Sequence, residues 1–276
     1  MDDRLSKFAR FKALHEQDRA FVIPNPWDAG SARLLASVGF DALATTSAGY
    51  AFSVGKRDSF AALTRGEILA NAQAIVEATD LPVSADLEEG FGRTPQACAE
   101  TIEAAIAVGL VGGSIEDATG DQNAPIFPMD QAVARIAAAA EVAQRRGFLL
   151  TARAENFLCG RPDLADTIAR LQAFSEAGAD VLYAPGLPDL EAIRTLCAEV
   201  DKPVNVVMGL RAPLYTVEEL SGAGVKRISV GGSFARAAFG ALKRAAEEVR
   251  AGSFTYAEDA MPGAEIAALM DSVKRG

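Results

Sequence analysis

Residues 81–117 read LPVSADLEEGFGRTPQACAETIEAAIAVGLVGGSIED. Two short apolar runs, 82–86 and 112–116, are typical of buried strands, and 95–108 between them has the spacing of apolar residues that is typical of an amphipathic helix. Gly109 follows the helical pattern at once and can adopt the left-handed conformation that ends a helix. A strand, a helix and a second strand in this order predict two parallel strands joined by a crossover helix.

The same unit recurs along the whole chain. Strands are expected at Phe21–Pro24, Ala42–Thr45, Pro82–Asp86, Gly112–Glu116, Leu149–Arg153, Val181–Ala184, Pro203–Val207 and Arg227–Val230. Helices are expected at Ser31–Val38, Arg65–Thr79, Pro95–Val108, Asp130–Arg146, Leu164–Ala177, Leu190–Val200, Val217–Ala223 and from Ser233 onward. Eight such units favour a closed (β/α)8 TIM-type barrel. An open dinucleotide-binding sheet would carry a GxGxxG fingerprint, which the first unit lacks.

Two segments lie outside the eight units. Residues 1–20 are expected to form a helix before the first strand, and Met261–Gly276 a final helix after a loop. No composition shift or low-complexity linker divides the chain. Residues 1–276 are therefore predicted to form one barrel domain, because α/β barrels commonly reach this length as a single unit.

The composition excludes several kinds of protein. Lys and Arg number 27 and Asp and Glu 37, and the net charge of −10 argues against a nucleic-acid or anionic-membrane partner. The amino terminus lacks the apolar region of a secretory signal, and no stretch approaches the ~18 apolar residues of a membrane span. Cys98, Cys159 and Cys197 show no CxxC spacing, which argues against a disulfide framework or a zinc site. The sequence predicts a cytoplasmic protein.

Acidic residues gather where the predicted strands end, which is where barrels of this type carry their chemistry. Asp86, Glu88 and Glu116 lie at strand ends, and Asp58 lies in the loop after the second strand. Several carboxylates at one rim repel each other and need a cation or shared protons. Oxygen ligands without thiolates suit Mg²⁺ or Mn²⁺. Surface charges and helix caps are the alternative, above all for Asp58 in its turn-forming loop.

Arg153 ends the predicted strand LLTAR. Its guanidinium group is suited to hold a carboxylate or phosphate with two hydrogen bonds. A structural salt bridge to Glu116 or Glu155 is the other interpretation, and the two are compatible. The predicted turn at Thr46–Gly49 has small side chains and free backbone N–H groups, which can bind an anion.

Missing residue types exclude common mechanisms. The sole histidine, His15, lies in the amino-terminal helix, so histidine acid–base catalysis is excluded. Lys202 and Lys226 precede strands instead of following them, which disfavours a Schiff-base aldolase. Cys159 lies on the appropriate side of the barrel, but a lone loop cysteine is more typical of a small apolar filler than of a nucleophile.

Several short segments together resemble the isocitrate lyase/phosphoenolpyruvate mutase superfamily over nearly the full length of the chain. They are Asn25–Arg33 (NPWDAGSAR), Thr45–Gly49 (TTSAG), Gly55–Ser59 (GKRDS), Pro82–Gly92 (PVSADLEEGFG), Ser114–Asp117 (SIED) and Ala152-Arg153. The resemblance implies a barrel whose last helix is exchanged with a neighbouring subunit, usually in a dimer of dimers. It also implies metabolism of an enolpyruvate or 2-oxo acid whose oxyanion is stabilised by Mg²⁺.

The same resemblance assigns roles to single residues. Mg²⁺ is expected at Asp86, with Asp58, Glu88 and Glu116 as direct or water-mediated ligands. Arg153 is expected to hold the substrate carboxylate. The remaining substrate contacts are expected from Trp27, Thr46, Ser47 and Ala48, and the catalytic residues are expected to be Arg153, Glu116 and Asp58.

Departures from the family pattern argue against the specific reactions of the lyase branch and of the mutase branch. The lyase branch carries a Lys-Lys-Cys-Gly-His-type loop after the fourth strand, whereas residues 118–128 here (ATGDQNAPIFP) contain neither Cys nor His. The mutase branch carries an Asn-bearing lid and a His after the sixth strand; Asn123 is present, but 183–186 (YAPG) lacks the His. The third strand ends in Asp86-Leu87-Glu88 instead of Asp-x-Asp, so the second ligand is one methylene longer.

The sequence therefore predicts a Mg²⁺-dependent carbon–carbon lyase or decarboxylase acting on a small 2-oxo or 2-hydroxy dicarboxylic acid. Two alternatives stay open: a mutase or hydrolase acting on the P–C bond of a phosphonopyruvate-type substrate, and an oxo-acid-binding protein with little turnover. Thr119–Pro128 is expected to be a lid over the barrel, or else a rigid connection.

Overall fold

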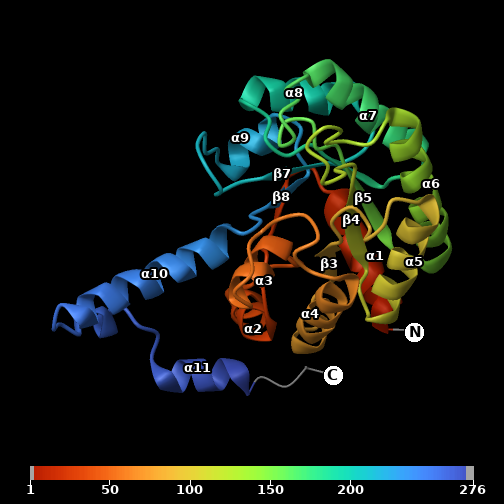
Figure 1. Cartoon of the computed structure of the whole chain (residues 1–276). Helices are drawn as coiled ribbons and strands as arrows, with labels where there is room; N and C mark the ends of the chain where they lie inside the picture. The colour runs from red at the N-terminus through yellow and green to blue at the C-terminus, as the bar shows by residue number, and fades with distance from the viewer. Residues whose placement is uncertain (1–2, 272–276) are drawn as a thin grey trace.

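The computed structural model of the chain describes residues 3–271, and its strands form a parallel barrel surrounded by helices (Figure 1). The strands are β1 (Phe21–Ile23), β2 (Leu43–Ala44), β3 (Val83–Asp86), β4 (Gly112–Glu116), β5 (Leu149–Arg153), β6 (Val181–Tyr183), β7 (Val204–Val207) and β8 (Arg227–Ser229). They pair in the order β1-β8-β7-β6-β5-β4-β3-β2. A backbone hydrogen bond of 3.0 Å from the Ala44 N–H to the Pro24 carbonyl links β2 to the end of β1. The predicted (β/α)8 barrel is confirmed.

The helices between the strands follow the predicted ranges to within two residues, whereas the amino-terminal helix, predicted over residues 1–20, ends at His15. They are α1 (Asp3–His15), α2 (Ala29–Val38), α3 (Ser47–Ser53), α4 (Arg65–Ala78), α5 (Pro95–Ala107), α6 (Met129–Arg146), α7 (Leu164–Glu176), α8 (Leu190–Glu199), α9 (Val217–Gly222), α10 (Ser233–Arg250), the 3₁₀ turn η1 (Thr255–Glu258) and α11 (Gly263–Met270). The sequence pattern missed α3 and η1. The predicted final helix is shorter than expected, and residues 272–276 of it lie outside the described residues.

Local chemistry explains where helices begin and end. Thr64 caps α4 by accepting the Glu67 N–H, and the Glu67 carboxylate in turn accepts the Thr64 N–H, which completes a capping box. Gly39 ends α2 at φ 97° and Gly178 follows α7 at φ 104°. A side chain would strain the backbone at both positions, so each glycine stops its helix and the next strand follows directly.

Helix α1 covers the amino-terminal end of the barrel. Phe11 is fully buried there against the first residues of several strands, among them Phe21, Val111, Leu149 and Val181. These contacts fill one end of the barrel with apolar side chains. The opposite end, where the strands terminate, is thus the end that is left for a cavity.

His15 is buried beneath the barrel floor, far from the strand ends that carry the acidic residues. Its Nδ1 lies 2.9 Å from the Phe11 carbonyl and its Nε2 lies 3.4 Å from the Arg227 guanidinium. Burial lowers the pKa of His15 to about 3, and the nearby Arg227 charge lowers it as well. The ring is therefore neutral in the folded protein, with Nδ1–H donating to Phe11. This position agrees with the prediction that His15 takes no part in catalysis.

His15 should make the protein sensitive to mild acid. The unfolded chain protonates His15 below its ordinary pKa of 6.5 while the folded chain does not, so stability is lost as the pH falls from 6.5 towards 3. The loss attributable to His15 between pH 7 and pH 5 is about 2 kcal/mol. Urea unfolding at both pH values should show this difference in the wild type and lose it in His15→Gln. An equal pH effect in the two proteins would contradict the assignment.

The carboxyl-terminal region leaves apolar side chains exposed. Helix α10 extends away from the barrel and α11 returns to contact α2 (Figure 1). Phe239, Leu242 and Val249 on α10 and Ile266 and Met270 on α11 are exposed large apolar residues. A patch of this kind on one chain typically marks an interaction surface. Within residues 3–271, none of the helices combines the length and the apolar character needed to cross a membrane.

Candidate active site

A cavity of about 940 Å³ opens at the carboxyl-terminal end of the barrel. The strand ends and the loops that follow them form its wall, as expected for this fold. The predicted site residues that line it are Thr46, Ser47, Ala48, Asp58, Asp86, Glu88, Glu116 and Arg153. These residues end or follow four strands, β2, β3, β4 and β5, because parallel strands bring their carboxyl ends to one rim.

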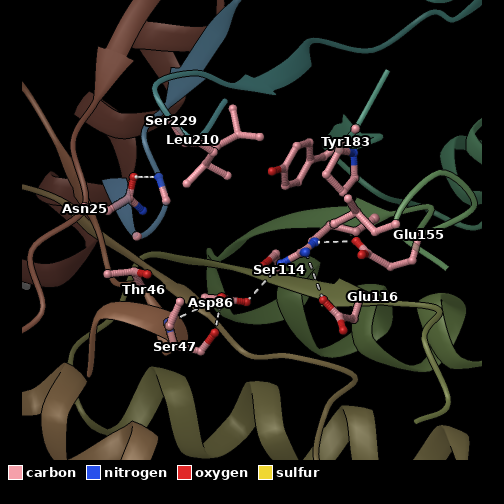
Figure 2. A pocket seen from close by; sticks show the side chains of 18 of the residues that line it. Asn25, Thr46, Ser47, Asp86, Ser114, Glu116, Glu155, Tyr183, Leu210 and Ser229 are labelled. Carbon is pink, nitrogen blue, oxygen red and sulfur yellow. Dashed lines mark hydrogen bonds and ion pairs between the residues drawn. The ribbon is translucent and has the colours of Figure 1, made fainter. Parts of the chain in front are cut away.

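Arg153 joins three acidic side chains at the centre of this site (Figure 2). Its Nη1 lies 3.1 Å from Asp86 Oδ1, its Nη2 3.0 Å from Glu116 Oε2, and its Nε 2.9 Å from Glu155 Oε1. Strand register places Glu116 directly beside Arg153. The structural salt bridge that the sequence left open is therefore present, with both of the expected partners and with Asp86 in addition.

Both carboxylate oxygens of Asp86 contact a protein side chain. Oδ2 accepts a 2.8 Å hydrogen bond from the Ser47 hydroxyl, and Oδ1 faces Arg153. The Thr45 hydroxyl accepts the Asp86 backbone N–H at 3.1 Å. Two side chains of the β2–α3 junction thus hold the end of β3 in place, and Asp86 has a defined orientation.

Glu88 has an unusual backbone conformation. Its φ is +47°, in the left-handed region that residues other than glycine rarely adopt. The Glu116 N–H donates to the Glu88 carbonyl at 3.0 Å, and the Glu88 N–H lies 3.4 Å from Asp86 Oδ1. The ends of β3 and β4 therefore impose this conformation. Such local strain is typical of functional sites.

The acidic residues disturb one another's pKa values. Burial and the neighbouring charges of Asp86, Glu89 and Asp58 together raise the pKa of Glu88 to about 8, against the opposing effect of Arg153. Burial also raises the pKa of Glu116, against the opposing effect of Arg153. The pKa of Asp58 is raised by partial burial and by the Asp86 carboxylate. The site therefore holds more negative charge than Arg153 balances.

This charge distribution fits a divalent cation. The four predicted ligands line one cavity and offer only carboxylate oxygens, which Mg²⁺ and Mn²⁺ prefer. Within residues 3–271, no three acidic, histidine or cysteine side chains already form a ligand set. Arg153 occupies an oxygen of Asp86 and one of Glu116, so a bound cation would compete with its guanidinium group for them.

The predicted anion-binding turn at Thr46–Gly49 is instead the first turn of α3. Thr46 is the N-cap and its hydroxyl accepts the Gly49 N–H at 3.2 Å. The Ser47 hydroxyl is engaged by Asp86, so the groups expected to be free are in part occupied. The interpretation as a turn was wrong because a seven-residue helix is too short to show a periodic apolar pattern.

Trp27 lies outside the residues that line the cavity. Its carbonyl accepts a 2.8 Å hydrogen bond from Asn71, and a β-carbon added at Gly49 would come within 3.1 Å of the Trp27 Cβ. Trp27 thus packs between α4 and α3, and its role in substrate binding stays a prediction.

The predicted lid, Thr119–Pro128, forms a small hairpin at the cavity mouth. Ala118 and Ile126 form an antiparallel bridge, and the Thr119 N–H donates to the Pro125 carbonyl at 3.0 Å. Gly120, at φ +72°, packs so tightly on the Phe60 ring that a β-carbon there would overlap it. The hairpin thus meets the loop that carries Asp58, whereas gating by this segment stays a prediction.

Sequence reasoning missed several residues of the site. Asn25 accepts the Val230 and Gly231 N–H groups and donates to the Thr45 carbonyl, and so ties together the ends of β1, β2 and β8. Tyr183 lines the cavity at the end of β6. Both are polar residues at strand ends, which is the signal that could have identified them.

Cys159 lines the cavity without the properties of a nucleophile. Its Sγ lies 3.6 Å from the Pro125 carbonyl, and burial raises the pKa of the thiol to about 11. A thiol with so high a pKa is protonated at neutral pH and is a poor nucleophile. The interpretation of Cys159 as a small filler agrees with this geometry.

Comparison with known proteins identifies a family and several similar enzymes. The family profile described as phosphoenolpyruvate phosphomutase matches residues 11–250. The chain is 29% identical to the 2-methylisocitrate lyase of Escherichia coli K12, over 87% of this chain and 81% of that protein. Over 99% of both chains it is 53% identical, with a TM-score of 0.96, to a structure from Burkholderia cenocepacia J2315 described as a candidate lyase/mutase. The structure of 2,3-dimethylmalate lyase is 28% identical, with a TM-score of 0.85, over 96% of this chain and 94% of that chain.

A parallel barrel with a polar cavity at its strand ends is the architecture of a (β/α)8 barrel enzyme. The chain belongs to the phosphoenolpyruvate phosphomutase family, within the isocitrate lyase/phosphoenolpyruvate mutase superfamily. The resemblance inferred from short sequence segments is confirmed.

Proposed function

We propose that the protein is a Mg²⁺-dependent carbon–carbon lyase or decarboxylase for a small 2-oxo or 2-hydroxy dicarboxylic acid. The observation that carries this proposal is Arg153, held by Asp86, Glu116 and Glu155 at the floor of an acidic cavity. A guanidinium group that is held in place can bind a substrate carboxylate, and the carboxylates whose charge Arg153 does not balance can bind the metal. Relatives named oxaloacetate decarboxylase and 2,3-dimethylmalate lyase, each 27% identical, support the class of substrate.

The residues have separate roles in this proposal. Asp86 would hold Mg²⁺ with Glu88, Glu116 and Asp58, and the bound cation would supply positive charge to the oxyanion of an enolate. Arg153 orients the carboxylate beside it, and Thr46, Ser47 and Ala48 border the same part of the cavity. Glu116 and Asp58 are also predicted catalytic residues: their pKa values are raised in the protein without metal, so either of them can hold a proton where it reaches the cation only through water.

An assay of the purified protein tests this function. Oxaloacetate and substituted malates should give 2-oxo acid products with Mg²⁺, and EDTA should abolish turnover because the acidic residues then repel the substrate carboxylates. Release of pyruvate is followed with a coupled dehydrogenase. If no oxo acid or phosphonate turns over in an EDTA-sensitive way, the proposal is wrong.

Two alternatives are separated by the same assay. The matching family profile is named for a P–C bond mutase, so conversion of phosphonopyruvate or release of phosphate from it would favour a mutase or hydrolase. Calorimetric binding of oxalate with Mg²⁺ without turnover of any substrate would favour an oxo-acid-binding protein.

The exposed apolar residues of α10 and α11 support an oligomer. We propose that this region exchanges between subunits and that two such dimers assemble into a homotetramer. The exposed apolar side chains along α10 need a partner surface, which its own barrel does not supply. Light scattering that finds a monomer at micromolar concentration would contradict the assembly.

The free thiols of Cys98, Cys159 and Cys197 support the cytoplasmic location predicted from the sequence.

A further inference from the structure

Tyr183 is placed beside Arg153 by the sheet. It ends β6, and the register pairs it with Arg153 on β5 and with Asn205 on β7. The Arg153 guanidinium carbon lies 5.1 Å from the centre of the Tyr183 ring. Figure 2 shows the phenol ring across the cavity from Thr46, with its hydroxyl directed into the open space on the side of Leu210. Tyr183 therefore lies beside the residue that is proposed to hold the substrate.

The Tyr183 hydroxyl is available to a ligand. The side chain is largely buried, with 9% of its surface exposed, and lines the cavity. Within residues 3–271, no protein group forms a hydrogen bond with this hydroxyl. The Tyr215 hydroxyl, in the same wall, instead accepts the Leu190 N–H at 3.0 Å. A hydroxyl that has no protein partner and opens into a cavity, on a side chain that is otherwise buried, is suited to bind substrate.

Other groups that commonly transfer protons are engaged or distant. The residues that line the cavity include no lysine and no histidine. The Cys159 thiol faces a backbone carbonyl, and the carboxylates of Asp86, Glu116 and Glu155 are paired with Arg153. Two further carboxylates of the wall, Asp58 and Glu88, are ligands of the metal in the proposed function. Burial raises the pKa of the Tyr183 hydroxyl far above its ordinary value, with Arg153 acting in the opposite direction. The phenol is therefore protonated before a reaction begins.

We propose that Tyr183 is the proton donor to the carbon of the enolate, a catalytic role that rests on the proposed lyase or decarboxylase function. When the C3–C4 bond of a 2-oxo dicarboxylate breaks, C4 leaves as carbon dioxide, the electron pair of the bond forms the C2–C3 double bond, and the C2 oxygen becomes the enolate oxyanion. The enolate C3 then takes the proton from Tyr183 Oη, which restores the C2 carbonyl and leaves a phenolate. The phenolate takes a proton from water, and the Arg153 charge near the ring stabilises it in the interval.

The reverse of this proton transfer gives a test that does not require bond cleavage. With Mg²⁺ in D₂O, the wild type should exchange the C3 hydrogens of 2-oxobutanoate, one of the two faster than the other because the donor lies on one face. Proton NMR measures both rates. Tyr183→Phe keeps the ring beside Arg153 and removes only the hydroxyl, so exchange should fall by about 100-fold or more and lose its preference for one hydrogen.

Control measurements separate catalysis from structure. The affinity for oxalate with Mg²⁺ should differ by less than about threefold between the wild type and Tyr183→Phe, because phenylalanine preserves the packing. Tyr50→Phe, on α3 and outside the cavity wall, should exchange like the wild type. Exchange by Tyr183→Phe at the wild-type rate and with the wild-type preference would overturn the role of Tyr183.

The outcome also separates this inference from the proposed function. Exchange that depends on Tyr183, without cleavage of any dicarboxylate in the assay above, supports the proton donor and overturns the lyase or decarboxylase. Cleavage that is unaffected by Tyr183→Phe supports the proposed function and overturns the proton donor. A wild type that neither exchanges nor cleaves overturns both.

Discussion

Arg153→Ala should reduce kcat/KM by about 10³-fold and destabilise the protein by about 3–5 kcal/mol. Arg153 bonds Asp86, Glu116 and Glu155, and its own side chain is 14% exposed. Its removal leaves these carboxylates crowded and unpaired, which is the costly way to break a buried ion network. The substrate carboxylate loses its partner at the same time. Urea unfolding and steady-state kinetics measure the two effects.

Added Mg²⁺ and the variant Arg153→Lys distinguish the effect of the Arg153 charge from that of its forked geometry. Mg²⁺ should stabilise Arg153→Ala more than the wild type, because the cation offsets charge that Arg153 otherwise balances. Arg153→Lys keeps the charge without the forked geometry, so it should recover most of the stability and less of the activity. Wild-type activity in either variant would show that Arg153 does not hold the substrate.

Asp86→Ala should weaken Mg²⁺ binding by about 100-fold or more and abolish the EDTA-sensitive turnover. Asp86 ends a strand, is held by the Ser47 and Thr45 hydroxyls, and lies 3.1 Å from the Arg153 guanidinium group. Its position is thus set before a metal arrives. Calorimetry with Mg²⁺, or with Mn²⁺ as a probe, measures the affinity.

Asp58→Ala is the matched comparison. Asp58 lies on an exposed loop and is expected to act through water, so its loss should weaken Mg²⁺ binding by about tenfold. Asp86→Asn keeps the shape and the Ser47 contact without the charge, and it should behave like Asp86→Ala. Wild-type Mg²⁺ affinity in Asp86→Ala would refute the metal site.

Local patterns in the sequence were sufficient to predict the fold. Short apolar runs, amphipathic periods and glycines such as Gly39 and Gly178 predicted all eight strands and the helices between them. These signals depend on neighbours within one turn or one strand, so they can be read without tertiary contacts. Helix α3 was missed because seven residues give too little periodicity, and its N-cap, Thr46, was interpreted as part of a turn.

The sequence also placed most of the candidate site. Parallel strands bring their carboxyl ends to one rim, so Asp86, Glu116 and Arg153 could be assigned to one cavity from position alone. The same rule would have included Tyr183, had the end of β6 been placed at this residue instead of at Ala184. Trp27 shows the limit of the rule, because it follows β1 and yet is not among the residues that line the cavity; its Cβ lies beside Gly49 of α3.

The sequence by itself determined the barrel, the family and the rim on which the acidic residues lie, because each follows from local pattern or from strand direction. Only the tertiary structure decided which groups pair. Arg153 meets Asp86 across 67 positions of sequence, Ser47 holds Asp86, and the Tyr183 hydroxyl is left without a protein partner. Strand register and side-chain orientation set these contacts, and they arise between segments that have no local influence on each other.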